Sequence, residues 1–182
     1  PMGSGRTSGL PSAAAMRQCA AAFTSMSQQW AEAIMKQAVV VGVEGVIGRY
    51  IAEHLSGLSG WEVIGLSRRK ARQARPRLRH IQVDLLDRAD SEAKLSQLTT
   101  ATHIFYCAFQ ARPTWAEHNA PNLALLVNAV EPIAAVSKAL EHVNLIQGTK
   151  YYGSHLGPFK TPAKESDPPH MLPNFYWDQE RW

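Results

Sequence analysis

The chain has few cysteines and no long apolar run. Its 182 residues include two cysteines, Cys19 and Cys107, too few for the disulfide framework of a small secreted domain. This usage is typical of a reducing compartment, and we expect a cytoplasmic protein. No stretch approaches the ~18 consecutive apolar residues that a membrane-spanning helix needs, so the sequence predicts no membrane partner.

Metal-ligand spacing is also missing, and the start of the chain lacks acidic residues. The seven histidines form no ligand-spaced cluster with Cys, Asp or Glu, so we expect no metal. Residues 1–31 contain no Asp or Glu and are rich in Ala, Ser and Gly. That composition suits a transit peptide, a disordered tail or a non-native extension. We expect a disordered or non-native tail over residues 1–36 and one folded domain over 37–182.

An apolar run broken by glycines is the most informative feature that is present. Residues 38–48 read AVVVGVEGVIG, and the Val-rich part is typical of a strand buried on both faces. The glycines stand where such a strand would turn into a helix, whose first N–H groups suit a pyrophosphate. An ordinary tight turn is the alternative, and the absence of a following Gly-Lys-Ser/Thr excludes a Walker loop. The predicted phosphate-binding residues are Gly42, Glu44, Gly45, Val46, Ile47 and Gly48.

Strand and helix patterns alternate along the rest of the chain. Further strands are predicted at 61–66, 80–83, 102–108 and 142–146, and helices at 91–98 and 122–140. Pro132 should kink or split the second helix. This alternation predicts an α/β fold with a doubly wound parallel sheet of the Rossmann type, in strand order 3-2-1-4-5. Such a sheet has a sixth strand, so we expect a chain truncated before it, as a fragment or naturally.

The predicted second strand ends in cations. It closes with the sequence GLSRR, which has no Asp or Glu where the ribose 2′-hydroxyl of NAD would be bound. Ser67, Arg68 and Arg69 instead offer a hydroxyl and two guanidiniums, which suit the 2′-phosphate of NADP(H). The alternative is that the two arginines only begin a solvated basic loop. NADPH is therefore the predicted cofactor.

The ends of the third and fourth strands complete the predicted nucleotide site. Asp84 follows the third strand, where its carboxylate would contact the adenine or cap a turn. Ligands of such sheets bind at the carboxyl ends of the strands. On this ground the further predicted contacts are Leu85, Tyr106, Cys107, Ala108 and Phe109.

Seven basic residues lie within positions 68–79 and suggest a second possible function. Such a run could bind nucleic acid. It lacks the interleaved aromatic residues on which bases stack, so we expect no nucleic-acid partner.

The chain from about residue 39 to 181 resembles the progesterone 5β-reductase/iridoid synthase family, a divergent branch of the extended short-chain dehydrogenases. The resemblance is carried by a series of short stretches in the family's order and spacing. These are VGVEGVIG from Val41, GLSRR from Gly65, QVDLLD from Gln82, AKLS from Ala93, THIFY from Thr102, GTKYY from Gly148, GPF from Gly157, DPP from Asp167 and NFY from Asn174.

This resemblance implies the chemistry. No Tyr-x-x-x-Lys pair occurs in the chain, and the family's catalytic residues correspond to Lys150 and Tyr176. Family members reduce the activated C=C bond of an enone or enal with NADPH. By resemblance, the Tyr176 hydroxyl would bond the substrate carbonyl oxygen and Lys150 would hold the ribose. Taken alone, Lys150 would be an ordinary surface lysine and Tyr176 a half-buried helix aromatic.

Some positions depart from the family pattern. Glu44 stands where the family usually has Thr, Trp177 replaces a second Tyr, and the region that would supply most of the substrate pocket is absent. We therefore expect an enone or enal reductase fragment that has little activity alone. The alternative is a non-catalytic NADP-binding module or relic.

Overall fold

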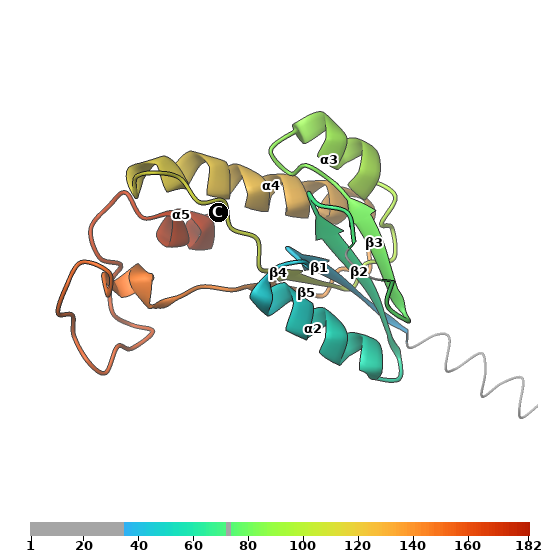
Figure 1. Ribbon diagram of the computed structural model, residues 1–182, viewed down its shortest axis with the longest axis horizontal. Helices are drawn as coiled ribbons and strands as arrows, with labels where there is room; N and C mark the ends of the chain where they lie inside the picture. Colours follow the sequence, from blue (N-terminus) through green and yellow to red (C-terminus); the bar gives the residue numbers. More distant parts are fainter. Residues whose placement is uncertain (1–34, 72–73) are drawn as a thin grey trace, which may run out of the picture. The chain divides into compact units, whose positions relative to one another are not determined.

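The computed structural model describes residues 35–71 and 74–182, in which Lys36–Trp182 is one compact unit. The tail expected over residues 1–36 lies outside the described residues, except for positions 35 and 36. Strands and helices largely alternate along the described chain (Figure 1), although no described helix separates β2 from β3. In order they are β1 (Lys36–Val41), α2 (Val46–Gly57), β2 (Trp61–Ser67), β3 (Leu78–Gln82), α3 (Arg88–Leu95), β4 (His103–Tyr106), η1 (Ala116–His118), α4 (Asn119–Val136), β5 (His142–Leu145), η2 (Thr149–Tyr152) and α5 (Phe175–Arg181).

The five strands form one parallel sheet in the order β3-β2-β1-β4-β5. This confirms the predicted doubly wound fold. β1 lies at the centre, where Val41 pairs with Leu66 of β2 on one side and with Tyr106 of β4 on the other. The carboxyl ends of β1, β2 and β4 therefore meet at one edge of the sheet.

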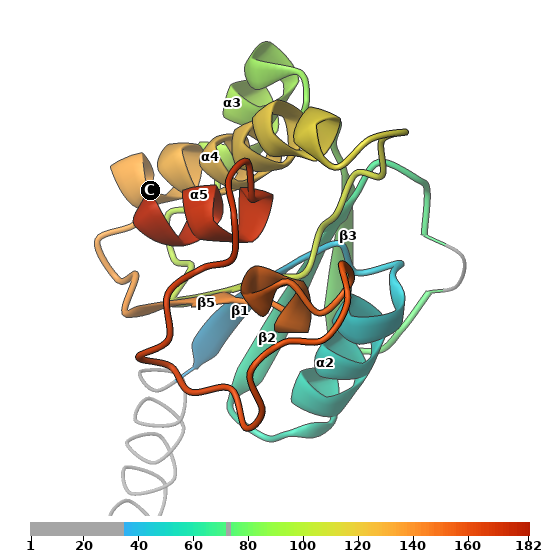
Figure 2. The same ribbon diagram turned by 90° about the vertical axis from the view of Figure 1, so that its left-hand side faces the viewer.

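Helices cover both faces of the sheet, which explains the continuous apolar run of β1. Val39 and Val41 face the larger core, which α3 and α4 complete, while Ala38 and Val40 face the smaller core beneath α2. Figure 2 shows α2 on one face, and α4 with α5 on the other. A side chain on either face of β1 is thus removed from water.

Helix α4 differs from its prediction. It begins at Asn119, ends at Val136 and runs through Pro132 as one helix of 18 residues, so the expected split is wrong. Pro132 is one of the buried residues of α4. In the part of the chain that the structure describes, no helix combines the length and apolarity needed to cross a bilayer.

Candidate functional site

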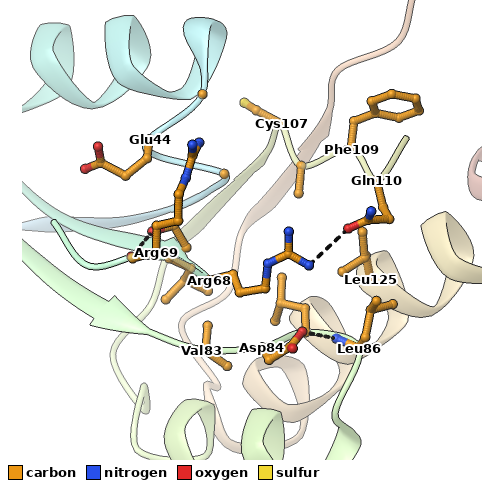
Figure 3. Close-up of a pocket in the computed structure, with 16 residues that line it drawn as sticks. Glu44, Arg68, Arg69, Val83, Asp84, Leu86, Cys107, Phe109, Gln110 and Leu125 are labelled. Carbon is orange, nitrogen blue, oxygen red and sulfur yellow. Dashed lines mark hydrogen bonds between the residues drawn. The ribbon is translucent and has the colours of Figure 1, made fainter. Parts of the chain in front are cut away.

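A cavity of about 300 Å³ lies at the carboxyl ends of the strands (Figure 3). Its walls come from the β1–α2 turn, the end of β2, the segment after β3 and the segment after β4. The residues that line it are Gly42, Glu44, Gly45, Leu66, Ser67, Arg68, Arg69, Val83, Asp84, Leu85, Leu86, Cys107, Ala108, Phe109, Gln110 and Leu125.

The glycine turn is tight and leaves no room for a side chain at Gly42 or Gly48. Gly42 has a φ of +83°, and the Gly42 and Val43 N–H groups donate to the Leu66 carbonyl at 2.9 and 3.2 Å. A Cβ at Gly42 would lie 3.1 Å from the backbone of Cys107 and Ala108. A Cβ at Gly48 would lie 2.4 Å from the Gly42 carbonyl oxygen. The helix therefore starts directly against the strand end only because these positions are glycine.

Helix α2 begins with amides that its own hydrogen-bond ladder does not use. Its first bond runs from the Arg49 N–H to the Gly45 carbonyl at 3.1 Å. The N–H groups of Val46, Ile47 and Gly48 precede that bond, as the first donors of any helix do. The Val46 and Ile47 side chains are exposed outside the cavity, and Gly48 is buried. What these three positions offer to a ligand is thus their backbone.

Glycine-bounded space, backbone donors and a helix N-terminus form a cradle that fits a pyrophosphate. Gly45 borders the cavity, and a Cβ there would be 3.1 Å from the Gly42 carbonyl oxygen. Glu44 also borders the cavity and brings a carboxylate to the same turn. The cradle thus combines the positive end of the α2 helix dipole with one anionic side chain, that of Glu44.

The segment after β2 is held in place by side chains from β2 and β3. The Ser67 hydroxyl donates to the Arg69 carbonyl at 2.6 Å and pairs with His80 Nε2 at 2.9 Å. Gln82 Nε2 donates to the Arg68 carbonyl at 3.1 Å. The backbone that carries the two guanidiniums is therefore fixed, while both side chains are exposed.

The two guanidiniums have different surroundings. Arg68 Nη1 donates to Gln110 Oε1 at 3.3 Å, so this side chain crosses the cavity (Figure 3). Arg69 lies nearer the glycine turn in the same view. Two carboxylates, Glu44 and Asp84, also line the cavity, and they balance the two cations in number.

Asp84 both caps a turn and borders the cavity. Its Oδ1 accepts from the Leu86 N–H at 3.1 Å, and its own N–H donates to Asp90 at 2.9 Å. Capping of a turn and contact with an adenine, the two roles considered for Asp84, are therefore both compatible with the structure.

The last residue of β4 faces the core, and the residues that follow it line the cavity. Cys107, Ala108 and Phe109 line the cavity, whereas Tyr106 is 1% exposed and packs in the larger core. Burial raises the pKa of the Tyr106 phenol. Burial also raises the pKa of the Cys107 thiol to about 11, which keeps it protonated at neutral pH.

Some lining residues have no counterpart among the predicted contacts. These are Leu66, Val83, Leu86, Gln110 and Leu125. Gln110 is positioned by the fully buried Asn122 of α4, which accepts from the Gln110 N–H at 2.8 Å and donates to its carbonyl at 2.9 Å. Asn122 is one of several polar residues in the mostly apolar sequence of α4, so no distinct signal in the sequence pointed to the loop that it holds.

Lys150 and Tyr176 lie outside the cavity lining and converge on a third residue, Trp115. The Lys150 Nζ is 5.6 Å from the Trp115 ring centroid, and the Tyr176 ring centroid is 6.4 Å from it. A Cβ at Gly148 would be 3.4 Å from the Tyr176 hydroxyl, so this hydroxyl lies beside a glycine three residues beyond the end of β5.

Helix α5 holds Tyr176 in this position. Asn174 accepts from the Tyr176 N–H at 3.2 Å and so caps the helix, and Gln147 Nε2 donates to the Tyr176 carbonyl at 2.7 Å. The side chain is half-buried, and burial raises the pKa of its phenol. The phenol is therefore protonated at neutral pH and can donate a hydrogen bond.

Aromatic rings connect the cavity to Tyr176. Phe109 lines the cavity, and its ring centroid is 5.4 Å from that of Phe175 on α5. Phe175 in turn lies 4.1 Å from Tyr176, centroid to centroid. A row of three neighbouring aromatic rings thus connects the cavity to the predicted catalytic tyrosine.

Comparison with known proteins agrees with this geometry. The NAD dependent epimerase/dehydratase family matches residues 38–174. The chain is 36% identical over 157 residues to the 3-oxo-Δ(4,5)-steroid 5-β-reductase of Arabidopsis thaliana, covering 79% of this chain and 40% of that protein. It is 37% identical over 158 residues to the (S)-8-oxocitronellyl enol synthase ISY1 of Nepeta racemosa, with the same coverage of 79% and 40%. The resemblance to the 5β-reductases and iridoid synthases is therefore confirmed.

Solved structures share the fold. WbmH of Bordetella bronchiseptica, in complex with NAD+, superposes with a TM-score of 0.64 at 20% identity, over 81% of this chain and 50% of that chain. WbmG of the same organism, in complex with NAD, gives 0.62 at 18% identity, over 79% of this chain and 46% of that chain. The chain spans about two fifths of the length of the curated relatives that it matches.

Proposed function

This chain belongs to the NAD dependent epimerase/dehydratase family, and from that membership we propose that it is the nucleotide-binding part of an NADPH-dependent reductase of activated C=C bonds, with an enone or enal as substrate. The observation that carries the proposal is the glycine cradle at the start of α2, with Arg68 and Arg69 on the neighbouring strand end. A substrate of this class agrees with the names of the steroid reductase and the enol synthase relatives.

The choice of NADPH over NADH rests on charge at the end of β2. A dinucleotide whose pyrophosphate sits at the glycine turn extends its adenosine toward β2 and β3, because those strands follow β1 in the sheet. Ser67, Arg68 and Arg69 then face the ribose 2′ position. An arginine forms charge-assisted hydrogen bonds with phosphate that a ribose hydroxyl cannot match.

The bound dinucleotide would supply a hydride, and the protein supplies alignment and the field around the substrate. The protonated Tyr176 phenol donates a hydrogen bond to the substrate carbonyl oxygen, where negative charge develops as the C=C bond is reduced. A donor aimed at such an oxygen lowers the activation barrier by about 3–4 kcal/mol. Lys150, whose Nζ is 5.6 Å from the Trp115 ring centroid, holds the ribose hydroxyls.

Binding of the two cofactors tests the nucleotide assignment directly. We expect the chain to bind NADPH at least about tenfold more tightly than NADH, since one charge-assisted bond contributes about 1.5–3 kcal/mol. The measurement is a fluorescence titration of each reduced nucleotide with the chain. Equal affinities would refute the 2′-phosphate assignment, and binding of neither would refute the nucleotide site.

Turnover tests the catalytic assignment separately. NADPH oxidation is followed with a 3-oxo-Δ4 steroid, a monoterpenoid enal and a small cyclic enone, using the chain and any longer product of the same gene. We expect turnover to require the further part of the protein that the relatives have and this chain does not cover. In the active form, Tyr176→Phe should lower kcat by about 10²–10³-fold, while Tyr50→Phe, at an exposed position on α2, should not. A full rate in Tyr176→Phe would remove this residue from the mechanism.

A further inference from the structure

A single hydrogen bond joins opposite walls of the cavity. The Arg68 side chain leaves the end of β2, crosses the cavity and donates from Nη1 to Gln110 Oε1 at 3.3 Å (Figure 3). We call this the Arg68–Gln110 bridge. Its two residues are 42 positions apart in the sequence, so the fold alone brings them together.

The Gln110 side of the bridge is rigid. Asn122 holds both the N–H and the carbonyl of Gln110, and a third bond from Asn122 Nδ2 to the His118 carbonyl, at 2.8 Å, fixes Asn122 itself. The Gln110 amide is also oriented, because its Nε2 donates to the Ala111 carbonyl at 3.2 Å. That bond turns Oε1 toward Arg68.

The Arg68 side is fixed at the backbone and free beyond it. Gln82 binds the Arg68 carbonyl, whereas the guanidinium is exposed and its described partner is Gln110. Motion of the bridge is therefore confined to the Arg68 side chain. Since Arg68 is an exposed arginine with many rotamers, breaking one neutral acceptor bond is enough to release it.

The bridge crosses the space that an adenosine would enter. This step rests on the proposed function: with the pyrophosphate at the glycine turn, the adenosine end reaches over β2 and β3, where Arg68 and Asp84 line the cavity. An adenosine cannot occupy that space while the guanidinium spans it. Binding must therefore open the bridge first.

We propose that the Arg68–Gln110 bridge is a latch on the adenosine end of the site, and that Gln110 is the positioning residue that keeps it closed. If a ligand binds only the open form, its apparent affinity is reduced in proportion to the fraction of molecules that are open. Loss of the Gln110 acceptor should remove that cost for every adenosine ligand alike.

Arg68 then has two opposing effects, which separate a latch from a simple binding residue. Closed, its guanidinium excludes any adenosine. Open, it binds a 2′-phosphate, for which it exchanges the Gln110 oxygen for a charged partner. A ligand without the 2′-phosphate gains nothing in that exchange. Removing Arg68 should therefore help one ligand and harm the other.

The test uses ADP-ribose and 2′-phospho-ADP-ribose as ligands, so that no nicotinamide or turnover is involved. Both are titrated calorimetrically into the chain, into Gln110→Ala and into Arg68→Ala. Gln97→Ala and Arg181→Ala are the matched controls, because both side chains are exposed and neither lines the cavity. Gln110→Glu is added as a variant that should tighten the bridge by making it an ion pair.

We expect Gln110→Ala to bind both ligands about two- to fivefold more tightly with their affinity ratio unchanged, the size expected for one hydrogen bond of about 0.5–1 kcal/mol. Gln110→Glu should weaken ADP-ribose. Arg68→Ala should bind ADP-ribose more tightly and 2′-phospho-ADP-ribose more weakly. The controls should match the parent chain.

Unchanged or weaker binding of both ligands by Gln110→Ala would overturn the latch, as would weaker binding of ADP-ribose by Arg68→Ala. These outcomes leave the proposed function standing as long as the parent chain prefers the 2′-phosphate ligand. A parent chain that binds neither ligand would overturn both the latch and the nucleotide site.

Discussion

Replacement of Gly48 by alanine tests how closely the first helix must approach the first strand. The added Cβ would lie 2.4 Å from the Gly42 carbonyl oxygen and 2.8 Å from the Gly42 carbonyl carbon. Real Cβ atoms do not approach backbone this closely, so the start of α2 must move away from β1 by roughly 0.5–1 Å. Both groups belong to the backbone, and no flexible side chain can absorb the shift.

The expected loss of stability in Gly48→Ala follows from overpacking. An extra methyl group in a well-packed site costs about 1–3 kcal/mol, and for a domain of this size each kcal/mol lowers the melting temperature by about 2–4 °C. Gly57→Ala is the matched control, because it lies in the same helix with open space around its Cβ. Since alanine favours a helix over glycine, Gly57→Ala should raise the stability by up to about 1 kcal/mol.

Thermal unfolding and ADP-ribose titration of the two variants give a paired result. We expect Gly48→Ala to melt at a lower temperature and to bind ADP-ribose more weakly, because the amides at the start of α2 move with the helix. Gly57→Ala should melt at the same or a higher temperature and bind normally. If Gly48→Ala kept the parent melting temperature and affinity, the close approach of helix and strand would not matter to the site.

Further expectations concern other parts of the structure. Asn122→Ala removes three hydrogen bonds to backbone groups and should lower the free energy of unfolding by about 2 kcal/mol or more in urea; an unchanged midpoint would contradict this. In a Cys19→Ser background, Cys107 should react with iodoacetamide at pH 8 roughly 100-fold more slowly than a thiol of pKa 9, because the pKa of Cys107 is raised to about 11. Bound ADP-ribose should slow this labelling further. Rapid labelling would contradict the burial of the thiol. The hydrogen bond from Lys160 lowers the pKa of Asp167, so its stabilisation is present above the unfolded pKa of about 3.9 and is lost as the pH falls through the folded value. The stability difference between the parent chain and Asp167→Asn should therefore shrink in acid, and a difference that grew instead would reverse the assignment.

The centre of the fold could be predicted because its physics is local. The four apolar residues 38–41 can be buried only if both faces of their strand are covered, and the glycines that follow mark a sharp turn. With right-handed crossovers, the alternation of elements then leaves few strand orders. The predicted order is the observed one.

Element ends and single helices were less predictable. Pro132 lacks an N–H group and would break an isolated helix, yet α4 continues past it because that stretch is buried between the sheet and other helices. Tertiary packing outweighs local propensity there. The alternation of β4 likewise sends Tyr106 into the core while its successors reach the cavity.

The missed wall residues come from segments that no local pattern joins to the glycine turn. Leu125 reaches the cavity from a helix far along the chain, and Gln110 does so because Asn122 fixes its loop. Contacts of this kind depend on how the elements pack. A pattern read along the sequence cannot contain them.

One residue of α4 has a consequence for how the site responds as a unit. The Asn122 side chain fixes the loop beside the cavity, while the Asn122 backbone carbonyl accepts from Gln179 Nε2 of α5, the helix of Tyr176, at 2.8 Å. Asn122 thus links the loop beside the cavity to the helix of Tyr176, and we expect ordering of either one to stabilise the other. Hydrogen exchange in α5 should accordingly slow when a ligand that lacks nicotinamide fills the distant cavity.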